Sequence, residues 1–246
     1  MKYNKSLTLL GLIVVLIVMS ATVFYGWYVL RSELEGTIED GVFEGSVTYW
    51  LKELAVNGDG EPILGGDGKP TYTGTLIDIT KDDVMYGGYN PATGLYSLDA
   101  GNMANQAFIG HIVVKVNLTK IGLMGRLRFL IMDEWLYIRT HIDGTIELPT
   151  VIPNEYIEGV GLTDRMHIVN QGNYRKPFPG KIYYYRSLLV EGETLDIEII
   201  NGADHYQLPV SDFYTDEAWV EFKLQIEVVQ SNRFSEIWGL PANFFD

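Results

Sequence analysis

The feature that most constrains the fold is a run of strict alternation near the C-terminus. Residues 220–228 (VEFKLQIEV) alternate between apolar and polar side chains without a break. Because successive side chains of a β-strand point to opposite faces, this pattern predicts a strand with one buried face. Five apolar residues on one face require a packed layer opposite them, so we expect a central strand of a sheet. The predicted core residues of this strand are Val220, Phe222, Leu224, Ile226 and Val228.

Strand signals continue through most of the chain after residue 42. Residues 193–200 (ETLDIEII) repeat the alternation, and dipeptides rich in Gly, Asn, Asp and Pro separate the apolar segments. We expect the Gly-rich residues 57–70 to form one long hairpin tip, and short helices only near residues 100–107 and 235–238. The remaining predicted strands are residues 43–51, 72–79, 108–118, 127–132, 136–142, 167–169 and 182–186. Many short strands with regular turns predict an all-β, jelly-roll-like β-sandwich.

A hydrophobic helix is predicted before this β domain. Residues 7–30 contain no charged side chain, and 24 helical residues span about 36 Å, enough to cross a bilayer. Lys2 and Lys5 precede the segment, so the positive-inside rule places the N-terminus in the cytoplasm and the C-terminus outside. We expect either a transmembrane anchor or a cleaved signal peptide. Both alternatives give an extracellular or cell-surface protein exported across the cytoplasmic membrane.

Three segments of the chain follow from these patterns. Residues 1–30 are the signal peptide or transmembrane anchor, residues 31–41 are a spacer, and residues 42–246 are the β-sandwich domain. No internal repeat and no linker rich in Pro or Ser divides the third segment. We therefore expect one exported β domain.

Composition excludes several classes of function. The chain has 18 Lys and Arg against 32 Asp and Glu, a formal charge of −14, so it lacks the basic face that a nucleic-acid binder requires. It contains no Cys, which excludes disulfides, thiolate metal sites and cysteine nucleophiles. The four His residues are not at metal-ligand spacing from one another. We expect no cofactor and no bound metal.

No catalytic constellation is visible. Adjacent carboxylates occur at residues 82–83, 133–134 and 216–217, but neighbours on a strand point to opposite faces, so we interpret them as solvated turn acids. Fingerprints for serine hydrolases, kinases and dinucleotide binding are absent. The Gly-rich turns resemble fragments of calcium loops without the acidic ligand that completes one. We therefore expect no enzymatic activity. Asn117 begins an N-glycosylation sequon and is a candidate modification site.

Several segments resemble the TasA/camelysin-like family of exported biofilm-fibre proteins. Residues 38–49 (IEDGVFEGSVTY) are similar to the opening strand that follows the leader in that family. Residues 181–195 (KIYYYRSLLVEGETL) resemble its tyrosine-rich strand, and residues 223–232 (KLQIEVVQSN) resemble its final core strand. Residues 136–142 (LYIRTHI) are similar to its aromatic-x-Arg strand. The resemblance covers about half of the exported part and leaves out residues 57–106.

The resemblance implies a structural subunit of an extracellular, pilus-like filament in a biofilm matrix. Such a subunit polymerises with copies of itself by donor-strand complementation, in which an extended segment of one copy completes a sheet of the next. Residues 31–41 are the candidate donor, with Leu34, Gly36 and Ile38 alternating against acidic residues. The alternative is a membrane-anchored cell-surface binding module. An exported hydrolase and an envelope coat protein are weaker alternatives.

Overall fold

The computed structural model describes residues 43–81, 88–151, 165–177, 181–206, 208 and 210–246. The chain divides into two units, Met1–Glu35 and Gly36–Asp246, and every described residue belongs to the second unit. The predicted hydrophobic helix at residues 7–30 lies outside the described residues. The candidate donor residues Leu34, Gly36 and Ile38 lie outside them as well.

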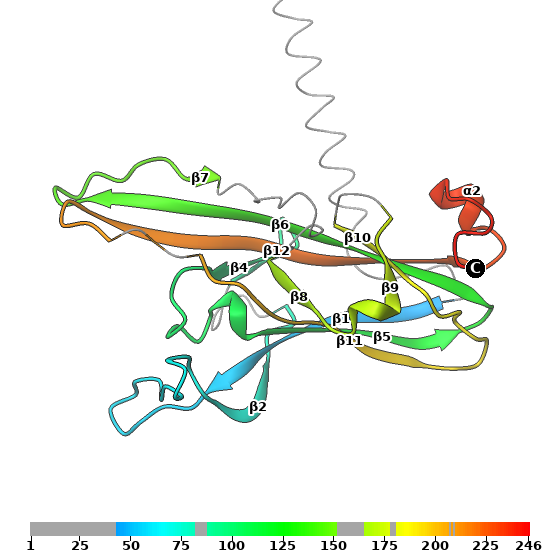
Figure 1. The fold of residues 1–246 in the computed structure, drawn as a ribbon, viewed down its shortest axis with the longest axis horizontal. Helices are drawn as coiled ribbons and strands as arrows, with labels where there is room; N and C mark the ends of the chain where they lie inside the picture. Colours follow the sequence, from blue (N-terminus) through cyan, green and yellow to red (C-terminus); the bar gives the residue numbers. More distant parts are fainter. Residues whose placement is uncertain (1–42, 82–87, 152–164, 178–180, 207, 209) are drawn as a thin grey trace, which may run out of the picture. The chain divides into compact units, whose positions relative to one another are not determined.

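The described residues form an all-β fold of two antiparallel sheets, as the alternation predicted (Figure 1). The first sheet has the strand order β2-β1-β5-β11-β8, with strands β2 (Tyr72–Asp78), β1 (Phe43–Leu54), β5 (Ile112–Ile121), β11 (Leu195–Ala203) and β8 (Met166–Ile168). The second sheet has the order β3-β4-β12-β6-β10-β9, with strands β3 (Tyr89–Asn90), β4 (Leu95–Asp99), β12 (Tyr214–Gln230), β6 (Gly125–His141), β10 (Ile182–Tyr185) and β9 (Tyr174–Arg175). A further strand, β7 (Thr150–Val151), pairs with β6. Short helices are the 3-10 turns Ile109–His111 and Gln171–Asn173 and the helix α2 (Phe234–Trp238).

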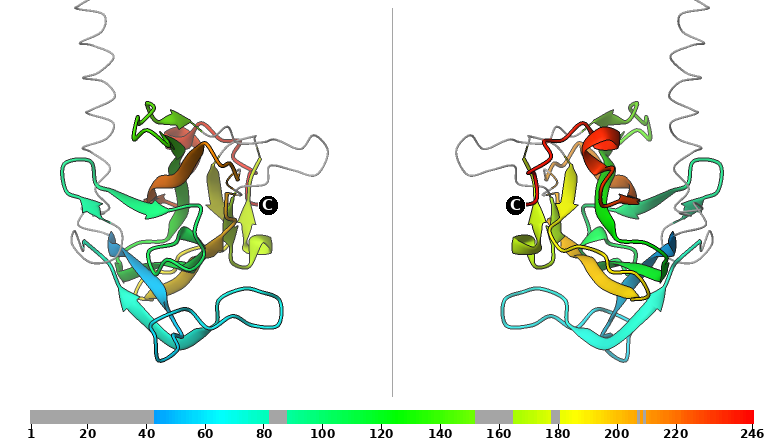
Figure 2. Two further views of the ribbon diagram at one scale, coloured as in Figure 1. Left: turned by 90° about the vertical axis from the view of Figure 1, so that its left-hand side faces the viewer. Right: turned by 90° about the vertical axis from the view of Figure 1, so that its right-hand side faces the viewer.

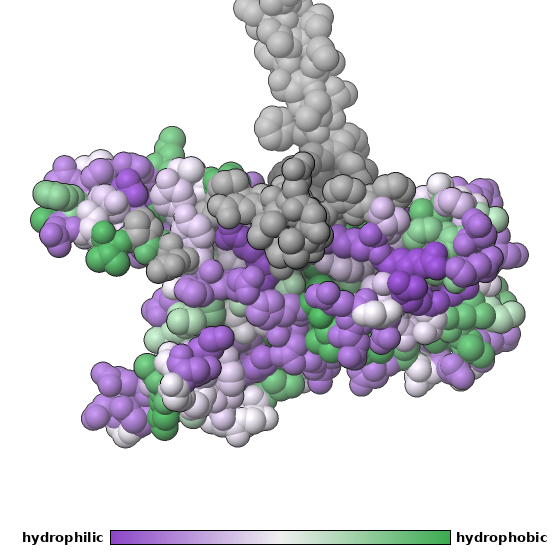
Figure 3. Space-filling view, viewed as in Figure 1, coloured by the Kyte–Doolittle hydropathy of each residue, from purple (hydrophilic) through white to green (hydrophobic). Residues whose placement is uncertain are grey.

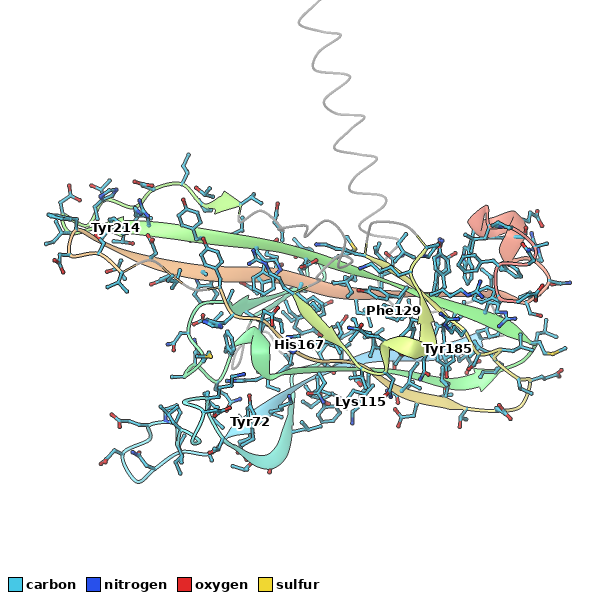
Figure 4. The ribbon with its side chains drawn as sticks, in the orientation of Figure 1. Tyr72, Lys115, Phe129, His167, Tyr185 and Tyr214 are labelled. Atoms are coloured by element: carbon cyan, nitrogen blue, oxygen red, sulfur yellow. The ribbon has the colours of Figure 1, made fainter. Side chains whose placement is uncertain are left out.

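The two sheets pack face to face around one hydrophobic core, and Figure 2 shows the layers from both ends. Leu51 and Val116 reach this core from the first sheet, and Phe129 and Phe222 reach it from the second. Phe129 is labelled between the sheets in Figure 4. Each of these side chains is almost fully buried, and burying such a residue contributes about 1.5–3 kcal/mol. The sheets are therefore held together chiefly by apolar packing. We call residues 43–246 the two-sheet body.

The alternating residues of β12 differ in burial. Val220, Phe222, Leu224 and Ile226 are buried in the core, and Val228 is partly buried against it. The opposite face is less exposed than the alternation indicated, because Lys223 is buried too. A Cβ atom added at Gly94, in the β3–β4 turn, would lie 3.0 Å from the Nζ atom of Lys223. This turn therefore lies close against that side chain.

β6 is one continuous strand where the sequence indicated two. The acidic pair at residues 133–134 does not form a turn, because Asp133 is held within the strand. Its Oδ2 atom accepts a hydrogen bond of 2.6 Å from the indole of Trp135, and its Oδ1 atom forms an ion pair with Lys181. The interpretation of Asp133 as a solvated turn acid was wrong. Local alternation does not reveal these partners, since Lys181 is 48 residues away.

The Gly-rich residues 57–70 form two tight turns where we expected one long tip. In the first turn the Gly60 amide donates to the Asn57 carbonyl at 3.1 Å, and in the second the Gly68 amide donates to the Gly65 carbonyl at 3.0 Å. Residues 61–65 run between the turns, and the Ile63 amide donates to the Ala55 carbonyl at 2.8 Å. The side-chain oxygen of Asn57 also accepts hydrogen bonds from two amides of its turn, at 3.0 and 2.9 Å. Each turn thus contains its own polar partners.

Burial at His111 predicts an acid-dependent loss of stability. His111 is buried beside the rings of Phe108 and Tyr72, and its burial lowers the pKa of the imidazole from the usual 6.5. The unfolded chain therefore binds more protons than the folded chain below about pH 6.5, so the free energy of unfolding falls as pH falls below that value. We expect His111→Gln to reduce this dependence between pH 6.5 and 5.5, measured by urea unfolding. An unchanged slope in the variant would contradict this origin.

Candidate functional site: an open side of the two-sheet body

The edge of β12 next to β4 is only partly paired. β4 pairs with β12 from Trp219 to Phe222, and the paired register ends there. At Leu224 a side chain replaces the strand, because the Tyr49 hydroxyl accepts from the Leu224 amide and donates to the Leu224 carbonyl, both at 3.1 Å. Alternate residues of an antiparallel strand direct their amide and carbonyl groups to the same neighbour. Ile226 and Val228 therefore point to this side as well, where no described strand pairs with them.

The edge of β1 next to β2 ends in a similar way. β2 pairs with β1 from Trp50 onward. At Tyr49 the loop after β2 takes over, because the Tyr49 amide donates to the Thr80 hydroxyl and the Tyr49 carbonyl accepts from the Ile79 amide, both at 2.9 Å. By the same alternation, the backbone groups of Val47 and Gly45 face this side. Within the described part of the chain, no strand pairs with them there.

These two edges, which the described strands leave unpaired, lie side by side. Tyr49 joins β1 to Leu224 of β12, and six residues earlier in β1 the ring of Phe43 packs against Gly125. A Cβ atom added at Gly125 would lie 2.9 Å from that ring, and Gly125 pairs with Gln230 in the β6–β12 ladder. β1 from residue 43 to 49 therefore runs alongside β12 from residue 230 to 224. We call this surface, formed by the backbone of Gly45, Val47, Ile226 and Val228, the open side.

Tyr49 closes one end of the open side. Its ring packs against Tyr96 with centroids 4.2 Å apart and meets Phe222 edge-on at 6.0 Å. Burial raises the pKa of the Tyr49 hydroxyl far above its ordinary range, and burial raises the pKa of Tyr96 to about 12. Both hydroxyls thus stay protonated at physiological pH. The Tyr49 hydroxyl can then donate to one backbone group of Leu224 while it accepts from the other.

The open side can bind an extended peptide by completing a sheet. Unpaired amide and carbonyl groups at a strand edge form a template for another strand, which gains backbone hydrogen bonds on binding. The inward neighbours of this edge are apolar, since Ile226 is buried and Val47 and Val228 are packed against the core. An added strand with alternating apolar residues would extend that core.

The structure separates the other residues that the sequence singled out. Asn117 lies in the middle of the central strand β5, paired with Ser46 on one side and Asp196 on the other, and is half-buried. Its sequon is therefore not in a surface loop.

The carboxylate of Asp216 lies in β12 and is buried beneath Arg139, whose guanidinium donates to both oxygens at 2.9 and 3.1 Å. The interpretation of Asp216 as a solvated turn acid was wrong, because its carboxylate is buried and paired. The alternation did not reveal the pair, since Arg139 is 77 residues away in the sequence. Residues 82–83 lie outside the described residues.

The described residues contain no group of three or more His, Asp or Glu side chains placed to hold a metal ion. In the same part of the chain, no helix is both long and apolar enough to cross a membrane. Sequence reasoning missed Tyr49, because one Tyr in an alternating strand gives no signal of a hydrogen bond to a strand 175 residues away.

Comparisons of the chain with family models, with curated proteins and with solved structures return no match.

Proposed function

We propose that this chain is a structural subunit of an extracellular filament or biofilm-matrix fibre, assembled by donor-strand β-augmentation. The observation that carries the proposal is the open side, where two strands from different sheets have neighbouring backbone groups that no described strand pairs with. A segment from a neighbouring copy would occupy this side and complete the body as a jelly-roll-like sandwich. The resemblance to exported biofilm-fibre proteins supports the same assignment.

The donor that we propose is the segment of residues 31–41. Leu34, Gly36 and Ile38 alternate with acidic residues, so a strand built from them presents one apolar face. The open edge of β12 from Leu224 to Gln230 is about 20 Å long, which six or seven extended residues match. The apolar face would pack beside Ile226 and Val47. Each subunit would give one segment and accept another, and such a heterologous contact builds a filament when it does not close into a ring.

The hydrophobic residues 7–30 complete the proposal. In this proposal they are the export signal of the subunit, which either leaves by cleavage or holds the subunit at the membrane with the C-terminus outside. The partners of the exported body are copies of itself. The formal charge of the whole chain, −14, disfavours nucleic acid as a partner.

A peptide of residues 23–40 is expected to stabilise a chain that begins at Gly41, because it restores the missing strand. At 100 times its dissociation constant a ligand stabilises its acceptor by about 2.7 kcal/mol, which corresponds to about 5–10 °C in Tm for a body of this size. Differential scanning fluorimetry measures this shift. The control peptide carries Leu34→Asp and Ile38→Asp, and it should leave Tm unchanged.

Two results together would contradict donor-strand assembly. They are the absence of a thermal shift at millimolar peptide and a full-length protein that is only monomeric in detergent. The open side would then serve a membrane-anchored surface module that binds an extended segment of another protein.

A further inference from the structure

A carboxylate lies on the core-facing side of the second sheet. Hydrophilic residues are spread over the visible face of the two-sheet body in Figure 3, where charged side chains meet water. Asp133 instead lies in β6 between Ile131 and Trp135, which are both almost fully buried, and opposite Phe222 of β12. Its side chain is only 4% exposed. This carboxyl group is therefore surrounded mainly by apolar side chains of the core.

Lys181 lies directly beside this carboxylate. The Ile131 amide donates to the Lys181 carbonyl at 3.0 Å, which continues the pairing of β6 with β10 one residue beyond Ile182. Alternation along the strand places Lys181 on the same face as Tyr183, which packs in the core. The ammonium group forms an ion pair with Oδ1 of Asp133 and donates to the Asp133 carbonyl at 3.3 Å. The amine and the carboxyl group are therefore in contact.

Trp135 makes the two oxygens of this carboxyl group different. Its indole N–H donates to Oδ2 of Asp133 at 2.6 Å, while Oδ1 faces Lys181. One oxygen thus has a proton source beside it, and the other has a fixed donor that stabilises a negative charge. The Lys181 nitrogen contacts Oδ1 and is therefore close to the Cγ atom that carries this oxygen. Groups held in such an arrangement react with effective molarities of about 10⁵–10⁸ M.

We propose that Asp133 and Lys181 condense to an amide, so that the two-sheet body contains an intramolecular isopeptide bond between β6 and the start of β10. Burial favours this product, because taking two charges out of water is costly and the amide removes both charges. The bond would join residues 48 positions apart in the sequence. This inference goes beyond the proposed function and does not depend on it.

The condensation consumes only the two side chains and releases one water molecule. The Lys181 ammonium first gives a proton to Oδ1, which leaves a neutral amine and a carboxylic acid. The amine nitrogen then attacks Cγ, and the electron pair of the C=O bond moves to Oδ2, where the Trp135 indole stabilises the charge. A proton passes from the nitrogen to Oδ1, the Cγ–Oδ1 bond breaks, and the C=O bond re-forms at Oδ2. The Lys181 side chain is 25% exposed, which gives the water a route to solvent.

Peptide mapping of the full-length protein by mass spectrometry tests the bond. Trypsin releases Asp133 in the peptide of residues 129–139, and it does not cleave after an acylated Lys181. We expect a branched peptide that joins residues 129–139 to residues 176–186 and is lighter than their sum by one water molecule. Linear peptides at full mass would overturn the proposal and leave an ion pair only. Loss of water from residues 129–139 without a branch would overturn it as well.

Lys181→Arg is the matched variant for this measurement. It keeps a positive charge beside Asp133, but the delocalised guanidinium is a poor nucleophile and should form no amide. We expect the peptide of residues 129–139 to appear at full mass in this variant. A peptide that still lacks one water would show that Asp133 reacts without Lys181, which overturns the proposal.

Trp135→Phe tests the part that the indole plays in the reaction. It keeps an aromatic ring in the core and removes the N–H group, so the branched peptide should accumulate in newly synthesised protein about 10²–10³-fold more slowly. Trp219→Phe is the control, because Trp219 is half-buried in β12 and its indole donates to Glu217 at 3.4 Å. This control should accumulate the branched peptide at the rate of the unsubstituted chain. Equal rates in the two variants would overturn the mechanism.

Discussion

Replacing Leu224 by aspartate is expected to abolish folding of the two-sheet body. Leu224 is almost fully buried in the core, and removing its side chain from that environment costs about 1.5–3 kcal/mol. An ionised carboxylate at the same position adds a desolvation cost of several kcal/mol. Since a folded domain is stable by only about 5–15 kcal/mol, the variant should lack a cooperative melting transition in circular dichroism.

Gln225→Asp is the matched control for Leu224→Asp. Gln225 is the next residue of β12, lies opposite Leu130 and points to the other face. The same aspartate there should cost less than about 1 kcal/mol. Equal tolerance, or equal loss, at the two positions would show that the alternating face does not stabilise the fold.

Val228→Pro is expected to prevent fibre formation while it leaves the subunit folded. The Val228 amide points to the open side, away from β6, so proline removes a donor that no described strand uses and that an added strand would need. The ring would also obstruct a strand at this edge. Negative-stain microscopy should show no fibres, and the subunit should melt within a few degrees of the unsubstituted chain.

Val229→Pro provides the contrast for Val228→Pro. The Val229 amide lies in the register that pairs with Arg126 of β6, so proline at this position breaks a bond inside the sheet. We expect this variant to lose stability by several times more than Val228→Pro. Fibres of normal width from Val228→Pro would contradict the open side as the acceptor.

Features that depend on neighbours in the sequence were predictable. Alternation over residues 220–228 predicted a strand with a buried face, and Leu224 and Phe222 lie in the core. The all-β class followed from many such segments and is confirmed by two antiparallel sheets. Both rest on a period of two, which any strand displays.

Features that depend on distant partners were not predictable. The buried pair of Asp216 with Arg139 and the bond from Tyr49 to Leu224 each join residues far apart in the chain. A charged or hydroxyl side chain in an alternating strand has the same pattern whether it faces water or a partner. The open side is equally invisible in the sequence, because it is defined by where β2 and β4 end relative to β1 and β12.

The long ribbon of β6 and β12 has a mechanical consequence. The two strands stay in register over 17 residue pairs, from Gly125 with Gln230 to His141 with Tyr214. A force along these strands loads all of their cross-strand hydrogen bonds in shear at the same time. A force across the strands would instead break the bonds one at a time. Tension between the two ends of the ribbon therefore meets the resistance of the whole ladder at once. A fibre stretched along this direction would therefore load the β6–β12 ladder of each subunit in shear rather than open it from one end.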